Sequence, residues 1–304
     1  MAESRKNAST FFSSLTFILT LSFGAKALRC LSNENKPVDW FIGYKLPDSA
    51  RNVSAYSMMY MDSDNPSWRL VPGTLDTPRQ AIYYTLSEIY TRMNISGTTY
   101  AMYNDALPTN SEDIVPNQRR GHTKGKQLQY NWPLIYDQNL PKEFADKYGD
   151  FKAALEGNHV IYPPWYSETK LVSLAGVTFT SFAKYWKWEK DLYADWLASS
   201  FNDSLLVQTW HRGNRDMGSS CNGTNKVMNV VTLGFNAIGY NFKSTQDHSK
   251  WAITNSSNLA GVCIGDINRQ KSQMKRSGGT VCFQHKNVWT AFNDLVKTIE
   301  PCNN

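Results

Sequence analysis

The sequence offers little from which a membrane anchor, a flexible linker or a zinc centre could be built. Beyond the first 27 residues, no apolar run reaches about 18 residues, so no membrane-spanning helix is predicted. No Gly/Ser-rich or Pro-rich stretch divides the 304 residues and no short repeat recurs, which favours a single compact unit. The HExxH and paired CxxC patterns are absent as well. With 41% hydrophobic and 19% charged residues, the chain can bury a large core and is not disordered as a whole.

Cysteine is scarce, and its count is odd. The five cysteines are Cys30, Cys221, Cys263, Cys282 and Cys302. In an oxidising compartment, four of them could form two disulfides and leave one thiol over. Composition and spacing alone leave the pairing open.

The N-terminus predicts that compartment. Arg5 and Lys6 precede the mostly apolar residues 11–23, and Ala25-Lys26-Ala27 follows. A basic start, a short apolar run and an A-x-A site describe a secretory signal peptide, and the run is too short to span a bilayer comfortably. We therefore expect residues 1–27 to be a signal peptide, cleaved after Ala27, and residues 28–304 to be the mature domain. The alternative is a buried first helix.

Five N-x-[ST] sequons after the predicted cleavage site support the secretory route. They begin at Asn52, Asn94, Asn202, Asn222 and Asn255. Such triplets are acceptors for N-glycosylation in secreted chains, so we expect some of them to be glycosylated. Both the lysosome and the cell exterior are compatible with this route.

The positive charge is modest. The formal net charge is +6, and residues 1–27 carry three basic residues against one acidic residue, which leaves about +4 on the mature chain. This balance is compatible with a polyanionic partner without requiring one. The five histidines would add positive charge near pH 5.

Strand-like and helix-like segments are mixed along the chain. Alternating or β-branched patterns predict strands at 38–46, 98–103 and 205–210. Apolar residues at helical spacing predict helices at 80–93, 190–201 and 288–299. The mixture predicts an α/β (mixed α+β) layered fold.

Two copies of one tripeptide stand in separate halves of the chain. His122-Thr123-Lys124 and His248-Ser249-Lys250 both read H-[ST]-K, and the two histidines are 126 positions apart. On a β-strand, residues i and i+2 point to the same face, so each H-x-K motif would present an imidazole beside an ammonium group. The repetition suggests two similar lobes, each of which contributes half of one site.

An imidazole beside an ammonium group suits a phosphate better than a metal ion, because a lysine repels a cation and must lose its proton to ligate one. If the two motifs face one phosphorus atom, a neutral histidine could attack it in line. A protonated histidine could donate a proton to the leaving oxygen and then activate water for the second step. The lysines would cover the charge on the phosphoryl oxygens. We therefore predict a site without metal or cofactor, made by His122, Lys124, His248 and Lys250. The alternative for any single H-x-K is a solvated strand.

Further motifs accompany the two H-x-K copies. They are Val38-Asp39-Trp40-Phe41, Tyr44-Lys45-Leu46-Pro47, Tyr103-Asn104-Asp105, Gly121-His122-Thr123-Lys124-Gly125, Ser181-Phe182-Ala183-Lys184, Asp247-His248-Ser249-Lys250-Trp251, Cys263-Ile264-Gly265-Asp266-Ile267-Asn268-Arg269 and Ser277-Gly278-Gly279-Thr280-Val281-Cys282. Together they make the chain resemble the deoxyribonuclease II family of the phospholipase D superfamily, from about residue 30 to residue 302.

This resemblance implies a pseudo-twofold pair of lobes, each a mixed sheet flanked by helices, with half-sites around residues 121–125 and 247–269. It implies acid-optimal, metal-independent endonuclease cleavage of DNA that leaves 3′-phosphate and 5′-hydroxyl ends, with the two H-x-K pairs as catalytic residues. Asp266 and Asn268 are weaker candidates, which could orient a histidine or bind a phosphoryl oxygen, because a Gly-Asp turn is often structural. His159, His211 and His285 are more typical of structural or surface groups, although His211 beside Arg212 could line a DNA channel.

The resemblance also implies the disulfides and exposes a departure from the family. It implies pairs Cys221–Cys302 and Cys263–Cys282, with Cys30 as the odd thiol. Relatives carry several tens of residues directly after the HTKG motif, including the usual partner of Cys30, whereas here Gly125 runs straight into residues 126–130. The family also tends to have a cysteine at position 252, where this chain has alanine. An excised exon or a faulty gene model would produce this gap.

Three functions follow from these observations. The first is an active nuclease, which the retention of both H-x-K motifs favours. The second is a nuclease-like DNA-binding protein with impaired catalysis, which the missing segment favours. The third is a secreted glycoprotein that keeps only the fold. DNA is the expected partner, no stable membrane association is expected, and the chain could act as a monomer or as a homodimer.

Overall fold

The described part of the chain forms two large β-sheets, two short two-stranded sheets and the helices that pack around them. A computed structural model describes residues 16–18, 29–48, 54–92, 99–104, 127–212 and 216–302. The two large sheets have nine and four strands. The predicted mixed α/β fold is thus confirmed, while the twofold relation between two lobes stays a prediction.

The strands are, in chain order, β1 (Thr16–Ile18), β2 (Cys30–Leu31), β3 (Pro37–Val38), β4 (Phe41–Lys45), β5 (Met58–Asp62), β6 (Arg69–Leu70), β7 (Tyr100–Asn104), β8 (Leu134–Asn139), β9 (Tyr166–Val172), β10 (Thr178–Lys184), β11 (Leu205–Thr209), β12 (Val227–Phe235), β13 (Tyr240–Lys243), β14 (Lys250–Thr254), β15 (Gly261–Gly265), β16 (Gly278–Gln284) and β17 (Val296–Ile299). The α-helices are α1 (Ala81–Arg92), α2 (Leu128–Asn131), α3 (Lys142–Lys147), α4 (Gly149–Leu155), α5 (Ala198–Phe201), α6 (Lys271–Met274) and α7 (Lys286–Asn293). Shorter turns are the 3-10 helices η3 (Trp186–Trp188), η5 (Asn236–Ile238) and η6 (Ser244–Gln246) and the π-helix η4 (Tyr193–Leu197).

The nine-stranded sheet runs β13-β12-β11-β14-β15-β16-β10-β9, and β17 joins it beside β12. From β11 to β9 all neighbours are antiparallel, so strand ends meet in alternation at each edge. At one edge β10, β11 and β15 finish while β14 and β16 begin. Because His248 lies two residues before Lys250, the first residue of β14, we call this edge the His248 end of the sheet.

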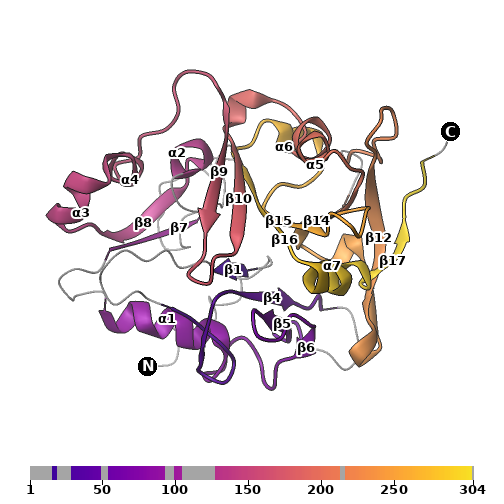
Figure 1. The fold of residues 1–304 in the computed structure, drawn as a ribbon, viewed down its shortest axis with the longest axis horizontal. Helices are drawn as coiled ribbons and strands as arrows, with labels where there is room; N and C mark the ends of the chain where they lie inside the picture. Colours follow the sequence, from indigo (N-terminus) through magenta and orange to yellow (C-terminus); the bar gives the residue numbers. More distant parts are fainter. Residues whose placement is uncertain are drawn as a thin grey trace.

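One face of this sheet packs against the four-stranded sheet β1-β4-β5-β6, which lies below it in Figure 1 together with α1. The buried side chains of this interface come from β4, β5, β14, β15 and α7, and include Ile42, Tyr44, Met59, Met61, Trp251, Ile253, Val262, Ile264, Trp289 and Phe292. They alternate along each strand, as a sheet with two buried faces requires. This packing brings β4, from the beginning of the chain, against the strand that follows the second H-x-K motif.

The other face of the nine-stranded sheet is covered by η4 and α5. Leu192, Trp196 and Leu197 pack there against Ala252 and Cys263, among other residues. The single layer of sheet therefore separates two apolar clusters, which holds β14 and β15 in a fixed position.

Most of the expected elements are present, and one expectation is wrong. Strands at 41–45, 100–104 and 205–209 and the helix at 81–92 agree with prediction, while the expected helix 190–201 is divided between η4 and α5. The segment 288–299 is not one helix, because α7 ends at Asn293 and Val296–Ile299 forms strand β17 against β12. Pairing with an existing strand outweighs the helical spacing there.

The structure describes several of the features that indicated a secretory chain: the cysteines, three of the sequons and part of the N-terminal segment. Disulfides join Cys221 to Cys302 and Cys263 to Cys282, the two pairs that the resemblance implied, and the buried Cys30 belongs to neither. The sequon asparagines 202, 222 and 255 are exposed, as glycosylation requires, whereas 52 and 94 lie outside the described residues. Strand β1 falls within the predicted signal peptide and pairs with β4. Within the described residues, no helix is long and apolar enough to cross a bilayer.

Candidate active site

The second H-x-K motif lies at the His248 end of the nine-stranded sheet. The segment that holds His248 connects η6 to β14, and Lys250 is the first residue of β14, paired with Thr209 of β11. Asp266 and Asn268 follow the end of β15, which is the other neighbour of β14. The sheet therefore gathers His248, Lys250, Asp266 and Asn268 at one edge.

An indole ring holds the imidazole of His248. The rings of Trp210 and His248 are stacked, with centroids 3.9 Å apart and planes at 28°. Trp210, which follows β11, is itself fixed because its Nε1 donates to the carbonyl oxygen of Thr245 at 3.1 Å. One ring face of the half-buried His248 is thus closed by an aromatic neighbour.

Cations surround the same imidazole. The pKa of His248 is lowered to about 4, first by burial and then by the positive charges of Lys250, Lys45 and Arg212, in that order of importance. The guanidinium carbon of Arg212 is 5.9 Å from the centre of the Trp210 ring. Three cations around a neutral imidazole form a setting in which a phosphate would be bound and attacked.

The ammonium group of Lys250 points back along its own motif. Its Nζ donates to the carbonyl oxygen of His248 at 2.6 Å, and the side chain is buried. The pair therefore lies together, as the i, i+2 spacing predicted.

The side chain of Asp266 binds a backbone amide of the neighbouring strand. Its Oδ1 accepts from the backbone N–H of Gly279 at 2.7 Å, across the start of β16. Gly278 has a φ of +143°, and a Cβ there would lie 2.6 Å from Asp266 Oδ1, so this Gly-Gly pair is needed for the carboxylate to reach the strand. The role that these contacts support for Asp266 is structural.

Asn268 differs from Asp266. It is buried, and within the described part of the chain its Oδ1 has no hydrogen-bond partner. Amide oxygen and nitrogen exchange places when the side chain turns over, so this position can present a donor as easily as an acceptor. A buried polar group of this kind at the His248 end suits contact with a ligand.

The other described histidines have contacts of their own. His211 faces Asp216, with 3.9 Å between Nδ1 and Oδ2, and burial lowers its pKa. His159 stacks between Trp132 and another aromatic ring, and His285 caps α7 by accepting from the backbone N–H of residue 288. Of the predicted channel pair, Arg212 is near His248 and His211 is turned towards an acidic residue.

The first motif, His122 and Lys124, lies outside the described residues, but both flanks of its segment are described. On one flank the hydroxyl oxygen of Tyr103, on β7, is buried, and burial and the charge of Asp266 raise the pKa of this tyrosine. On the other flank, Nε2 of the buried Gln127 donates to the carbonyl oxygens of Ser167 and Ser181, on β9 and β10. The chain around the first motif is therefore attached to the sheet that carries the second.

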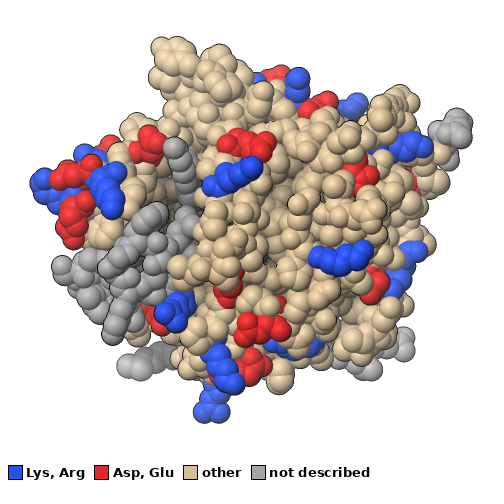
Figure 2. All heavy atoms as spheres, in the orientation of Figure 1, with Lys and Arg blue, Asp and Glu red and all other residues tan. Residues whose placement is uncertain are grey.

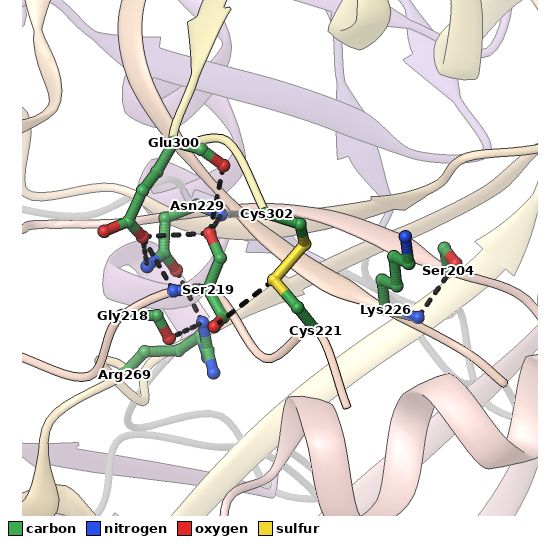
Figure 3. The surroundings of a disulfide bond; sticks show 9 residues. All are labelled: Ser204, Gly218, Ser219, Cys221, Lys226, Asn229, Arg269, Glu300 and Cys302. Carbon is green, nitrogen blue, oxygen red and sulfur yellow. Dashed lines mark hydrogen bonds between the residues drawn. A yellow bond between two sulfur atoms is a disulfide. The ribbon is translucent and has the colours of Figure 1, made fainter. Parts of the chain in front are cut away.

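A cavity of about 620 Å³ opens elsewhere, beside the Cys221–Cys302 disulfide. Figure 3 shows how Asn229 joins Glu300 to Arg269 there: Nδ2 donates to Glu300 Oε2 at 2.8 Å, and Oδ1 accepts from Arg269 Nη1 at 2.6 Å. The cavity is lined by Glu300 and by Asp191 and Asp195, against one buried guanidinium that already pairs with Asp191. Its carboxylates make it a poor site for a phosphate, so size does not identify the active site here.

Charge is spread thinly over the face of the described part that Figure 2 shows. Lys and Arg stand apart from one another, often beside Asp or Glu, and most of the face is uncharged. Among the described residues, no cluster of three His, Cys, Asp or Glu side chains could hold a metal ion.

Sequence reasoning proposed His248, Lys250 and Asn268 as site residues but missed most of the residues that surround His248. Trp210 and Lys45 reach His248 from β11 and β4, which are distant in sequence. The acidic residue that precedes the motif, Asp247, is fully buried and hydrogen bonded. Nothing in a single sequence indicates that these residues lie near His248. The family resemblance does include the segment 44–47.

Comparisons with known proteins identify the family of this chain. The family model described as Deoxyribonuclease II matches the chain in two parts, residues 29–126 and 125–302. Plancitoxin-1 of Acanthaster planci is 36% identical in an alignment that covers 96% of this chain and 97% of plancitoxin-1. Deoxyribonuclease-2-alpha of Rattus norvegicus is 33% identical, with 95% and 99% covered, and Deoxyribonuclease-2-beta of Homo sapiens is 28% identical, with 92% and 93% covered.

The same comparisons locate the missing segment. The alignment with plancitoxin-1 is 351 positions long and thus exceeds the 304 residues of this chain by 47, so plancitoxin-1 has at least 47 residues where this chain has none. The two parts of the family match meet at residues 125 and 126, directly after the first H-x-K motif. With both parts of the match covering residues 29–302, the chain belongs to the deoxyribonuclease II family.

Proposed function

We propose that this chain is an acid endonuclease that hydrolyses DNA phosphodiesters without a metal, through a phosphohistidine intermediate. The observation that carries the proposal is the imidazole of His248, held on Trp210 and surrounded by Lys45, Lys250 and Arg212. Membership of the deoxyribonuclease II family, and the names of the relatives as deoxyribonucleases, support DNA as the substrate.

The reaction proceeds in two in-line steps. In the first, a ring nitrogen of His248 attacks phosphorus and forms an N–P bond, while the bond from phosphorus to the 5′-oxygen breaks. His122, as imidazolium, gives its proton to that oxygen, which leaves as a 5′-hydroxyl. In the second step His122 takes a proton from water, the resulting hydroxide oxygen bonds to phosphorus, and the N–P bond breaks to leave a 3′-phosphate.

The assignment of His248 as the nucleophile rests on its surroundings. A nucleophilic imidazole must be neutral, and burial together with the three cations lowers the pKa of His248 to about 4. At pH 5 most of it is therefore unprotonated. The same cations stabilise the phosphoryl oxygens, whose negative charge spreads in the transition state, and Asn268 can donate to one of them.

His122 is within reach of this site. Five peptide units join it to Gln127, and an extended chain of that length spans at most about 18 Å. Gln127 is attached to β10, and three inter-strand steps of the sheet, about 14 Å, separate β10 from β14. The tether therefore allows two imidazoles to approach opposite sides of one phosphate.

The first test is resistance to chelation. Plasmid DNA incubated with the purified chain at pH 5 in EDTA should be nicked at the same rate as without EDTA, because the groups that stabilise charge are Lys and Arg side chains. Gel electrophoresis of the plasmid measures the rate. Loss of nicking in EDTA, with recovery on adding magnesium, would contradict the mechanism.

The pH dependence gives a second prediction. Below pH 4 His248 becomes protonated and can no longer attack, so kcat/KM should fall as the pH falls through about 4. The proton donor must stay protonated, and for a histidine this predicts a fall as the pH rises through about 6.5. The profile measured from pH 3 to pH 8 should be bell-shaped. A rate that keeps rising to pH 8 would exclude an imidazolium donor.

The secretory pathway is the proposed location, ending in the lysosome or outside the cell. The predicted signal peptide, the exposed sequon asparagines and the two disulfides all support it. An acidic lysosome would supply the pH that the two histidines require.

A second candidate function is a DNA-binding protein with impaired catalysis. The observation that favours it is the gap of at least 47 residues relative to plancitoxin-1, next to the first H-x-K motif. In that case DNA would bind through the cations around His248 while turnover would be far below that of a relative.

A further inference from the structure

A buried tyrosine from the four-stranded sheet contacts the second H-x-K motif from behind. Tyr44 lies on β4 and is fully buried, among Trp68, Phe235 and Phe242. Its hydroxyl donates to Asp247 Oδ2 at 2.5 Å, across 203 positions of sequence. Burying a hydroxyl group among aromatic rings costs free energy unless the hydroxyl is hydrogen bonded, and here Asp247 supplies the acceptor.

Asp247 is the centre of these contacts. Its carboxylate is buried, yet four donors surround it: the hydroxyls of Tyr44 and Ser249 and the amide of Gln208 at Oδ2, and the backbone N–H of Ser249 at Oδ1. The Ser249 hydroxyl is 2.6 Å from Asp247 Oδ2 and 3.0 Å from the Tyr44 oxygen, and the indole of Trp251 donates to that oxygen at 3.4 Å. These donors offset part of the cost of burying the carboxyl group, although burial still raises the pKa of Asp247.

The residues of this network alternate with those of the motif. Asp247 has extended backbone angles, φ −107° and ψ 117°, and leads into β14. In extended chain, successive side chains point to opposite sides, so Asp247 and Ser249 face Tyr44 while His248 and Lys250 face the other way. Fixing the first pair fixes the backbone on which the second pair stands.

We propose that Tyr44, acting through Asp247 and Ser249, is a positioning residue that sets the place of the His248 imidazole for in-line attack. The proposal rests on the proposed function, because it assumes that His248 is the nucleophile. Strand β4 then contributes to catalysis as well as to the hydrophobic core. Tyr44 fixes the backbone of the motif through Asp247, and its neighbour Lys45 adds positive charge beside the imidazole.

The requirement for such a support is geometric. In-line attack tolerates little error, and a displacement of about 1 Å can cost roughly a hundredfold in rate. His248 belongs to a short connection between η6 and β14, and its own ring is held by stacking on Trp210. Stacking fixes the plane of a ring but leaves it able to slide, so the backbone must be fixed separately.

The test compares two tyrosine-to-phenylalanine variants. Tyr44→Phe removes only the hydroxyl, and Tyr60→Phe, its matched control on the next strand β5, removes the hydroxyl of an equally buried tyrosine that lies among Phe41, Asp62 and Arg69. Steady-state cleavage at pH 5 should show kcat lowered by about ten- to a hundredfold in Tyr44→Phe, with KM and DNA binding at low salt unchanged. Tyr60→Phe should keep the parent kcat.

Two further measurements separate position from stability. Both variants are melted, and the ring resonances of His248 are followed by NMR as the pH is changed. A positioning role predicts altered His248 resonances in Tyr44→Phe alone, at a temperature where both variants are folded. Should Tyr44→Phe fail to fold, Ser249→Ala, which removes a second hydroxyl from the same network, takes its place with the same expected fall in kcat.

The possible outcomes are distinct. If Tyr44→Phe, or Ser249→Ala in its place, is folded and keeps the parent kcat while His248→Ala is inactive, the positioning role is wrong and the proposed function stands. If kcat falls equally in Tyr44→Phe and Tyr60→Phe, with unaltered His248 resonances, the role of Tyr44 is structural only. If His248→Ala remains active, the proposed function itself fails.

Discussion

Replacing His248 with alanine should lower the rate of DNA cleavage at pH 5 by at least about a hundredfold, the lower range for loss of a positioned nucleophile or acid–base group. The same is expected of His122→Ala. His248 is the nucleophile in the proposed mechanism, and no other imidazole among the described residues is stacked on Trp210 amid the same cations. Single-turnover rates measured on plasmid DNA would give the size of the loss.

Binding should survive the same substitution. Contacts of Lys and Arg with phosphates dominate affinity for DNA at low salt, and His248→Ala leaves Lys45, Lys250 and Arg212 in place. The matched control is His285→Asn, because His285 is a histidine at the start of α7 and asparagine is also a good helix cap. Near-normal turnover of His248→Ala, with His285→Asn equally active, would remove His248 from the chemistry.

The elements that were predicted correctly depend on local patterns. Helix α1 has apolar residues at helical spacing, and strand β11 begins with a short run of adjacent apolar residues; each lies where predicted. The segment 288–299 shows the limit of this reasoning. Its apolar spacing fits a helix, but residues 296–299 pair with β12 across more than 60 positions of sequence. Long-range pairing of this kind leaves no local trace.

The same contrast applies to the site. His248 and Lys250 were proposed because two H-x-K copies make one chemical unit, and the resemblance added Asp266 and Asn268. Tyr44, Trp210 and Lys45 come to His248 only because β4 packs on β14 and β11 pairs with it. For Asp266 the structure adds a contact that the sequence does not reveal, because its carboxylate binds the neighbouring strand through the backbone N–H of Gly279. Such distinctions depend on tertiary contacts.

Restoring the family segment between Gly125 and Lys126 should raise specific activity at pH 5 by up to about a hundredfold. In this chain only two residues separate Lys124 from Gln127, whose side chain binds main chain of β9 and β10. The alignment with plancitoxin-1 contains at least 47 positions that this chain lacks, and the family match is divided at residues 125 and 126. The first motif is therefore attached to the sheet differently in the two chains. We expect the altered attachment to place His122 and Lys124 less accurately against the phosphate, which lowers the rate.

The experiment needs three proteins of measured folded fraction: this chain, a chimera that carries the segment of plancitoxin-1, and a chimera that carries a Gly/Ser linker of the same length. The linker relieves the short tether but supplies no strand to pack beside the motif, so it separates chain length from packing. We expect the plancitoxin-1 segment to raise both activity and melting temperature, and the linker to raise neither, because added loop length alone lowers stability slightly. If all three proteins cleave DNA equally and melt at the same temperature, the segment is dispensable and the impaired-nuclease alternative should be abandoned. If the linker alone restores activity, the short tether, and not lost packing, is what limits the first half-site.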